Sequence, residues 1–261
     1  MIISGLQKVT LLDYPGHIAC TIFFGNCNLR CPFCHNMELV TNPEHFPKFT
    51  KEEILDFLKE RKGKLNGVAI TGGEPLLNVD IEDLLKPIKE LGYPIKLDTN
   101  GFFPEMIEKL IDDNLVDKFA MDIKAGFTNY EKVIGVTAPE NRRGKTVQWT
   151  VFHCEPDVVA ARRGELSEPA FADKVKKSIN LLITRAPDYE FRTTCVKGLH
   201  TEADFYEIRD MIKGAKEYYL QDYKAAPGME DLPFKPFTRE ELESFAKIVE
   251  DAVGKVEIRG V

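Results

Sequence analysis

Short apolar runs alternate with amphipathic stretches along most of this chain. Apolar runs of this length are typical of buried strands, and the stretches between them repeat apolar positions at the helical period. Strands are predicted at residues 17–24, 68–71, 95–98, 119–123, 189–196 and 218–221, with 256–259 as a further terminal strand. Helices are predicted at residues 50–61, 79–91, 104–113, 129–134, 171–184, 202–213 and 238–253.

Two of these helices begin with capping signals. Thr50 is followed three residues later by Glu53, and Thr238 by Glu241, which is the capping-box spacing. Pro104 suits the first turn of its helix.

Alternation of strands with helices predicts a parallel α/β sheet with right-handed crossovers. Six such units favour a partial, open (β/α)6 barrel of the TIM type with its helices outside, in a single domain spanning residues 1–261. A doubly wound open sheet is the second interpretation. In both folds, ligands bind at the carboxyl ends of the strands.

Residues 137–169 interrupt this alternation, inside the crossover from the fourth to the fifth strand. The segment holds Trp149 and the basic pairs Arg142–Arg143 and Arg162–Arg163. A loop of this length predicts a lid, a docking surface for a partner, or a surface decoration of no function.

Composition narrows the possible functions. The 261 residues include 35 basic and 42 acidic side chains, and the pI of about 5.4 argues against binding to nucleic acid. Apolar runs fall well short of the roughly 20 residues of a membrane span, and the first residues do not resemble a signal peptide. A cytoplasmic location is therefore expected, where six cysteines favour metal binding or catalysis over disulfides.

Three cysteines follow the first predicted strand with C-x3-C-x2-C spacing. Thiolates of Cys27, Cys31 and Cys34 on one short loop suit three irons of a [4Fe–4S] cluster, which leaves the fourth iron open. The alternative is a zinc knuckle with His35 or His45 as fourth ligand. Because His35 directly follows Cys34, shared tetrahedral ligation is awkward, and the spacing favours the cluster.

The other cysteines carry less information. Cys20 and Cys195 lie inside predicted strands, where a cysteine acts as a small core residue. Cys154 lies in the 137–169 segment, and both roles stay open for it.

The cysteine motif, with Phe33 before its last cysteine, resembles that of the radical S-adenosylmethionine enzymes. Residues 21–36 are similar to the activating enzymes of glycyl-radical proteins, and in particular to the anaerobic ribonucleoside-triphosphate reductase activating family. The similarity runs from about Gly5 to the C-terminus, with the 137–169 segment as the main departure. It implies a [4Fe–4S] cluster and S-adenosylmethionine, with Phe33 and His35 beside the cofactor.

Gly72, Gly73 and Glu74 end the second predicted strand in the string TGGEP. Glycines allow a close approach of the backbone, although a pair of glycines is more often only a turn. The resemblance implies that the backbone here receives the amino group of S-adenosylmethionine.

Polar residues also end the third and fourth predicted strands. Asp98, Asp122 and Lys124 resemble the set that holds the carboxylate and ribose of S-adenosylmethionine, although Asp-Thr-Asn-Gly taken alone is a turn. Asp98, Thr99 and Asp122 also resemble a site for a monovalent cation beside that carboxylate.

Arg192 lies on the fifth predicted strand, on the face that also carries Glu190 and Thr194. A buried arginine needs an anionic partner, and the string EFRTT matches the family. His200 follows in the next loop, either as a contact of the cofactor or as a surface histidine.

The resemblance implies a reaction that needs no protein base or nucleophile. One electron cleaves S-adenosylmethionine at the cluster, and the 5′-deoxyadenosyl radical removes a hydrogen atom from a glycine of a partner enzyme. A flavodoxin or ferredoxin-type protein would supply the electron. The alternatives are a pyruvate formate-lyase-type activase, a small enzyme acting on a metabolite, as 7-carboxy-7-deazaguanine synthase does, and a non-catalytic iron–sulfur or zinc module.

Overall fold

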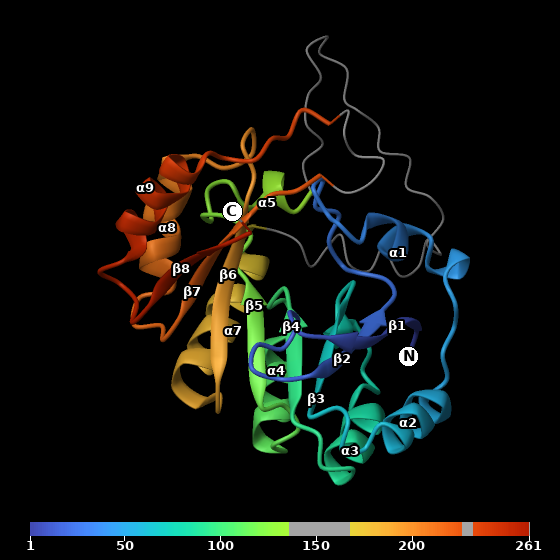
Figure 1. Cartoon of the computed structure of the whole chain (residues 1–261). Helices are drawn as coiled ribbons and strands as arrows, with labels where there is room; N and C mark the ends of the chain where they lie inside the picture. Colours follow the sequence, from blue (N-terminus) through green and yellow to red (C-terminus); the bar gives the residue numbers. More distant parts are fainter. Residues whose placement is uncertain (136–167, 226–231, 261) are drawn as a thin grey trace. The chain divides into compact units, whose positions relative to one another are not determined.

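Among the described residues, eight strands form one open, mostly parallel sheet in which they follow one another in chain order (Figure 1). The computed structural model describes residues 1–135, 168–225 and 232–260. The strands are β1 (Ile3–Thr10), β2 (Ala19–Phe24), β3 (Gly67–Gly72), β4 (Ile95–Thr99), β5 (Lys118–Asp122), β6 (Tyr189–Cys195), β7 (Tyr218–Asp222) and β8 (Val256–Arg259). The helices are α1 (Met37–Thr41), η1 (Pro43–His45), α2 (Lys51–Glu60), η2 (Pro75–Leu77), α3 (Glu82–Glu90), α4 (Pro104–Asp112), α5 (Tyr130–Val133), α7 (Glu168–Arg185), α8 (Glu202–Met211) and α9 (Arg239–Val249).

The predicted α/β class and open, mostly parallel sheet are confirmed. The strand count was too low, because β1 was missed: it pairs antiparallel with β2 in front of the alternating units. Its exposed stretch Gln7–Val9 and two register shifts against β2 break the alternation by which a strand is found in a sequence. The terminal strand at 256–259 lies where it was predicted.

The capping box predicted at the start of α2 is present in the structure. At α2 the hydroxyl of Thr50 accepts the Glu53 N–H at 3.1 Å, while the Thr50 N–H donates to the Glu53 carboxylate at 2.7 Å. The helix predicted from residue 79 begins only at Glu82, because the chain first makes turns after η2. None of the described helices is long and apolar enough to span a membrane.

The 137–169 segment ends earlier than predicted. Helix α7 begins at Glu168, so the last residues assigned to that segment are helical. Residues 136–167, with Trp149, Cys154 and both basic pairs, lie outside the described residues.

The described chain divides into two compact units. Unit 1 comprises Met1–Asn28, Asn36–Asp122 and Asn180–Phe191, and unit 2 comprises Leu29–His35, Ile123–Ile179 and Arg192–Val261. In unit 1, helices α2, α3 and α4 run alongside strands β2 to β5 (Figure 1). One face of these strands carries mainly apolar side chains, and the following strand and helix residues of this core have no exposed area: Ile22, Ile70, Leu97, Phe119, Leu58, Leu85 and Leu110.

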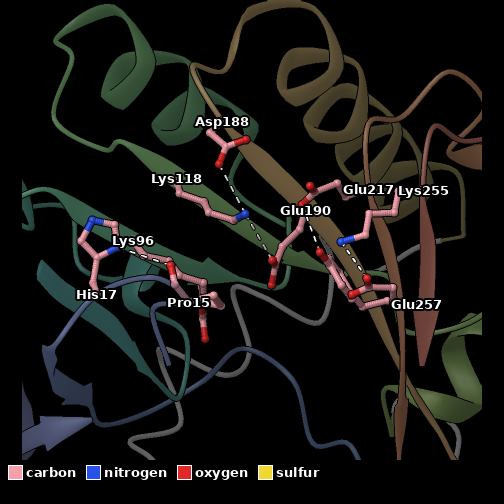
Figure 2. A network of polar contacts seen from close by, with 11 residues as sticks. Pro15, His17, Lys96, Lys118, Asp188, Glu190, Glu217, Lys255 and Glu257 are labelled. Atoms are coloured by element: carbon pink, nitrogen blue, oxygen red, sulfur yellow. Dashed lines mark hydrogen bonds and ion pairs between the residues drawn. The ribbon is translucent and has the colours of Figure 1, made fainter. Parts of the chain in front are cut away.

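The opposite face of the unit 1 strands carries charges instead. Register places Lys96 of β4 beside Lys118 of β5. The Lys118 ammonium lies 3.3 Å from the Asp188 carboxylate and 3.4 Å from that of Glu190, which is fully buried (Figure 2). Lys96 in turn contacts Asp98 at 2.5 Å. Each buried charge therefore has an opposite charge beside it, as burial requires.

Unit 2 is built around aromatic packing. Phe205 of α8 and Phe245 of α9 stack with ring centres 4.2 Å apart, and Phe237 meets Phe245 edge-on at 5.0 Å. Strands β7 and β8 pair in parallel, and α9 packs on both of them. The pairing with β7 and the packing of α9 therefore hold the short C-terminal strand β8 in place.

We expect Lys118→Met to lower the free energy of unfolding by about 3 kcal/mol, because it removes the ammonium that lies 3.4 Å from the buried Glu190 carboxylate. Urea denaturation measures the change. The control is Lys59→Met, whose exposed pair with Asp56 should contribute less than about 1 kcal/mol. Equal small losses in both variants would contradict the prediction.

Candidate functional site

The three cysteines of the motif occupy the loop after β2. Cys27 belongs to unit 1, and Cys31 and Cys34 belong to unit 2. The Cys34 N–H donates to the Cys31 carbonyl at 3.0 Å, which closes a turn. Cys31 is buried, whereas Cys27 and Cys34 are half-buried. Two of the three cysteines of the loop are therefore partly exposed residues.

Two further described cysteines have a different environment. Cys20 and Cys195 have no exposed area, as expected for core residues. Burial raises the pKa of the Cys20 thiol to about 12 and also raises that of Cys195. Thiols of this kind are poor metal ligands, because the thiolate is the ligand form.

Nowhere in the described part of the chain do three His, Cys, Asp or Glu side chains form a group set to hold a metal ion. The donor chemistry of the loop nevertheless fits an iron–sulfur cluster. Cys27, Cys31 and Cys34 are three soft ligands within one short loop, and soft thiolates favour such clusters.

Gly72 and Gly73 are required by the close approach of two backbone segments. Gly72 has φ +113°, and a Cβ there would lie 2.4 Å from the Phe24 backbone. A Cβ on Gly73 would lie 1.8 Å from the Asn26 carbonyl oxygen. The Gly73 and Glu74 N–H groups donate to Phe24 and Asn26 at 2.7 and 2.9 Å. The glycines thus bring the end of β3 against the chain just before Cys27, a role that the sequence did not reveal.

Glu74 is buried, and its carboxylate bonds within the protein. It accepts the Leu76 N–H at 3.1 Å, the Thr99 hydroxyl at 2.9 Å and the Asn100 N–H at 2.7 Å. The sequence placed Glu74 among the residues that bind the cofactor. In the structure its side chain joins the end of β3 to the end of β4, which is a positioning role.

Asp98 and Thr99 project from opposite faces of β4, as neighbouring residues of a strand must. The Asp98 carboxylate pairs with the buried Lys96 ammonium at 2.5 Å. The Thr99 hydroxyl donates to Glu74 and accepts the Gly101 N–H at 3.2 Å. The two side chains therefore do not converge on one point.

Asn100 is a site residue that the sequence analysis missed. Its side-chain amide bonds to Asn28 at 2.8 Å and lies 3.8 Å from the Cys27 sulfur. Asn36 was missed as well: its amide donates to the Gly72 carbonyl at 2.8 Å. Asparagine is common in turns, so the sequence alone does not distinguish Asn36 and Asn100 from ordinary turn residues.

Asp122 ends β5 in unit 1 and is half-buried. Lys124 and Arg192 belong to unit 2, where both side chains are half-buried. The Arg192 carbonyl accepts the Ile123 N–H at 2.8 Å, which fixes the backbone of β6 at this level.

His200 is a buried residue that orients backbone. Its Nδ1 accepts the Val196 N–H at 3.0 Å, and its Nε2 lies 2.7 Å from the Lys124 carbonyl, to which it donates. This pattern requires the neutral Nε2–H tautomer. Its ring also meets Phe33 edge-on at 6.4 Å. Both ring nitrogens are therefore engaged with backbone, and the burial of His200 excludes the alternative of a surface histidine. The predicted cofactor contact stays a prediction.

His35 is the second histidine tied to backbone in unit 2. Its Nε2 contacts the Lys224 carbonyl, and its ring stacks on Tyr223 with centres 6.1 Å apart and planes 20° apart. The residue directly after the last cysteine is thus held at two points, which limits the freedom of the loop.

A Radical SAM superfamily model matches residues 21–149 of the chain. A relative in Methanocaldococcus jannaschii, "Putative glycyl-radical enzyme activating enzyme MJ1227", is 31 % identical over the whole chain and 96 % of its own length. The chain belongs to the glycyl-radical enzyme activating enzymes. A pyruvate formate-lyase-activating enzyme of Clostridium pasteurianum is 34 % identical to this activating enzyme over 47 % of the chain and 52 % of its own length.

Solved structures agree on the fold. Streptococcus suis SuiB bound to its precursor peptide SuiA matches 90 % of the activating enzyme and 47 % of its own chain, with a TM-score of 0.62 and 15 % identity. TYW1 with a lysine–pyruvate adduct matches 90 % and 74 %, with a TM-score of 0.52 and 16 % identity. At this identity the likeness concerns the fold alone. Membership of the radical SAM family implies a [4Fe–4S] cluster and S-adenosylmethionine.

We expect the stability of the enzyme to fall as the pH drops below about 6.5, because His200 resists protonation in the fold. Burial lowers the pKa of His200 below 6.5, and its contacts with Lys124, Val196 and Asp204 offset this only in part. The unfolded chain therefore takes up a proton near pH 6.5 that the folded chain refuses, which favours unfolding at lower pH.

Urea denaturation between pH 7.5 and 5.5 measures this loss. The His200→Gln variant should show a smaller loss over that range than the wild type. His45→Gln changes an exposed histidine and should keep the full loss. The same pH dependence in all three proteins would contradict the prediction.

Proposed function

We propose that this activating enzyme generates a glycyl radical on an anaerobic ribonucleoside-triphosphate reductase. The identity to a glycyl-radical enzyme activating enzyme over the full length carries the activase part of this proposal. The choice of reductase rests on the resemblance of residues 21–36 to the activating proteins of that enzyme.

Cys27, Cys31 and Cys34 would hold three irons of the cluster. The bound cluster and S-adenosylmethionine supply a one-electron cleavage that yields methionine and a 5′-deoxyadenosyl radical. Cys27 and Cys34 are half-buried residues of one loop, which supports this assignment.

The cofactor contacts proposed from the resemblance divide into direct and indirect ones. Backbone groups of Gly72 and Gly73 would receive the amino group of S-adenosylmethionine. The half-buried charges of Asp122, Lys124 and Arg192 would meet its ribose and carboxylate. The partly exposed Asp98 belongs to the same set, with Lys96 holding its carboxylate in place.

Phe33 and His35 would line the cofactor from the cysteine loop. His200 supports this arrangement, because it holds the Lys124 carbonyl and contacts the Phe33 ring. Tyr223 does the same for His35. In this proposal the protein groups position and shield the cofactor, and the radical chemistry belongs to the cofactor.

The electron would come from a flavodoxin or a ferredoxin-type protein, because each cleavage consumes one electron. The hydrogen atom taken from the partner's glycine would appear in 5′-deoxyadenosine. Loss of that atom leaves the glycyl radical on the partner, and no group of the activating enzyme is consumed.

A pyruvate formate-lyase is the second candidate partner. The specific observation that favours it is the group of pyruvate formate-lyase-activating enzymes among the relatives, in Clostridium pasteurianum and Listeria monocytogenes. Each matches about half of this chain. A metabolite substrate, as in 7-carboxy-7-deazaguanine synthase, is less favoured, because the relative matched over its full length carries the name of an activase.

We expect anaerobically reconstituted, reduced protein to form 5′-deoxyadenosine from S-adenosylmethionine and to raise a glycyl-radical signal in the reductase by electron paramagnetic resonance. Cys31→Ala should abolish both signals. Cys20→Ala changes a buried cysteine away from the motif and should retain them.

Three outcomes would contradict parts of this proposal. A radical on formate-lyase but not on the reductase would select the second partner. Cleavage of S-adenosylmethionine without a radical on either partner would favour a metabolite substrate. Full cleavage by the Cys31→Ala variant would remove the cluster assignment.

A monovalent cation beside Asp98, Thr99 and Asp122 is also proposed. Thr99 would contribute its carbonyl oxygen, because its hydroxyl bonds to Glu74. Replacing potassium and sodium by choline should weaken S-adenosylmethionine binding on the order of tenfold, the equivalent of about 1.4 kcal/mol. Calorimetric titration measures the affinity, and an unchanged affinity would show that the Lys96 ammonium alone balances Asp98.

A further inference from the structure

Asn100 is held in one orientation by four hydrogen bonds. Its backbone N–H donates to Glu74 at 2.7 Å, and its side-chain oxygen accepts the Phe102 N–H at 3.1 Å. The side-chain nitrogen therefore faces the other way, toward Asn28 at 2.8 Å and the Cys27 sulfur at 3.8 Å. The usual ambiguity between amide oxygen and nitrogen does not arise, because only oxygen can accept from Phe102.

The two hydrogens of this amide have two acceptors. One points to the side-chain oxygen of Asn28 and the other to the sulfur of Cys27. All of these residues belong to unit 1, and Asn100 is only 4 % exposed. Water therefore competes little for the amide, and the sulfur contact is a built feature of the fold.

We propose that Asn100 is a positioning residue that tunes the reduction potential of the cluster through the sulfur of Cys27. The inference rests on the proposed function only in taking Cys27 as a cluster ligand. A hydrogen bond donated to a ligating sulfur draws negative charge from the cluster and stabilises its reduced, more negative state. Asn100 thereby raises the reduction potential and makes the entering electron easier to accept.

The Glu74 carboxylate fixes the position of Asn100 relative to the Cys27 sulfur. Glu74 receives the hydroxyl of Thr99 and the N–H of Asn100, so the end of β4 cannot shift without breaking two bonds to a buried charge. The TGGEP and DTNG strings are thus linked through one carboxylate, and the link leads to the first cysteine of the motif.

The competing explanation is that Asn100 only shapes the turn after β4. Its side-chain oxygen bonds the Phe102 N–H two residues on, which is the ordinary turn-forming contact of asparagine. A turn-forming residue would leave the potential of the cluster unchanged. Asn100→Asp keeps that turn contact and removes the donated hydrogens, but it also adds a negative charge. Asn100→Leu removes the turn contact and the donated hydrogens without adding a charge, so a lowered potential must appear in both variants.

The test is a redox titration of the reconstituted protein, monitored by electron paramagnetic resonance, without S-adenosylmethionine or partner. Wild type, Asn100→Asp and Asn100→Leu are compared with Asn180→Leu, a matched change at an exposed position of α7. At a fixed applied potential we expect the ratio of reduced to oxidised cluster to fall about tenfold in both Asn100 variants. For a one-electron couple this corresponds to a shift of about 59 mV to lower potential. Asn180→Leu should match the wild type.

Two results would overturn the inference. If both Asn100 variants carry the wild-type iron content and the wild-type potential, Asn100 only shapes the turn. If both variants fold by circular dichroism but bind no cluster, Asn100 serves assembly and not tuning. Should only Asn100→Leu lose the cluster, a wild-type potential in Asn100→Asp would overturn the inference.

Failure of the proposed function would look different. The titration needs neither S-adenosylmethionine nor a glycyl-radical enzyme, so a shifted potential in a protein that activates no partner would support the inference and contradict the function. A wild-type chain that takes up no iron would contradict the cluster assignment of Cys27 itself, and with it both proposals.

Discussion

The arrangement around the cysteine loop in unit 1 depends on one buried carboxylate. Glu74 accepts three hydrogen bonds, two of them from the residues that end β4. A charge buried without hydrogen-bond donors would cost several kcal/mol, so the burial of Glu74 requires these donors. Hydrogen bonds to an ionised carboxylate are also stronger than those between neutral groups. Removing the carboxylate would leave three buried donors unsatisfied, at a cost of about 1–3 kcal/mol each. Asn100, and through it Cys27, takes its position from this residue.

The two faces of the unit 1 strands are stabilised by different interactions. One face has aliphatic and aromatic side chains and needs only close packing against α2, α3 and α4. The other has Lys96 and Lys118, each with a carboxylate partner. Charged groups on that face are aligned by strand register, so the same regularity that builds a parallel sheet also places Asp98 at the carboxyl end of β4.

Most of the fold followed from periodicity and capping, whereas most of the fine structure of the site did not. Thr50 and Glu53 identified a helix start because a capping box is local in sequence. Strand β1 was missed because its partner β2, and not its own alternation, holds it in place. For the same reason the side-chain contacts of Glu74 could not be predicted: its donors include Leu76 and residues about 25 positions later, and no local pattern encodes them.

The cysteine loop shows the complementary case. Its spacing and its resemblance to a known family were enough to indicate the chemistry, because the donor atoms are fixed by residue type. Asn100 and Asn36 were obscured because asparagine is common in turns, so that only their contacts with Cys27 and Gly72 distinguish them from ordinary turn residues. Residue identity thus predicts the metal donors, whereas geometry was needed to find Asn100 and Asn36 beside the loop.

The deep burial of Cys20 and Cys195 affects how the protein responds to oxidation by air. Oxidation of cysteine proceeds through the thiolate and needs access, and both are denied to these two side chains. Among the described residues, damage by air is thereby directed to the motif loop, where mild reductants can reverse the early oxidation products. Rebuilding a cluster lost to oxygen would then begin from a chain whose Cys20 and Cys195 thiols are still intact.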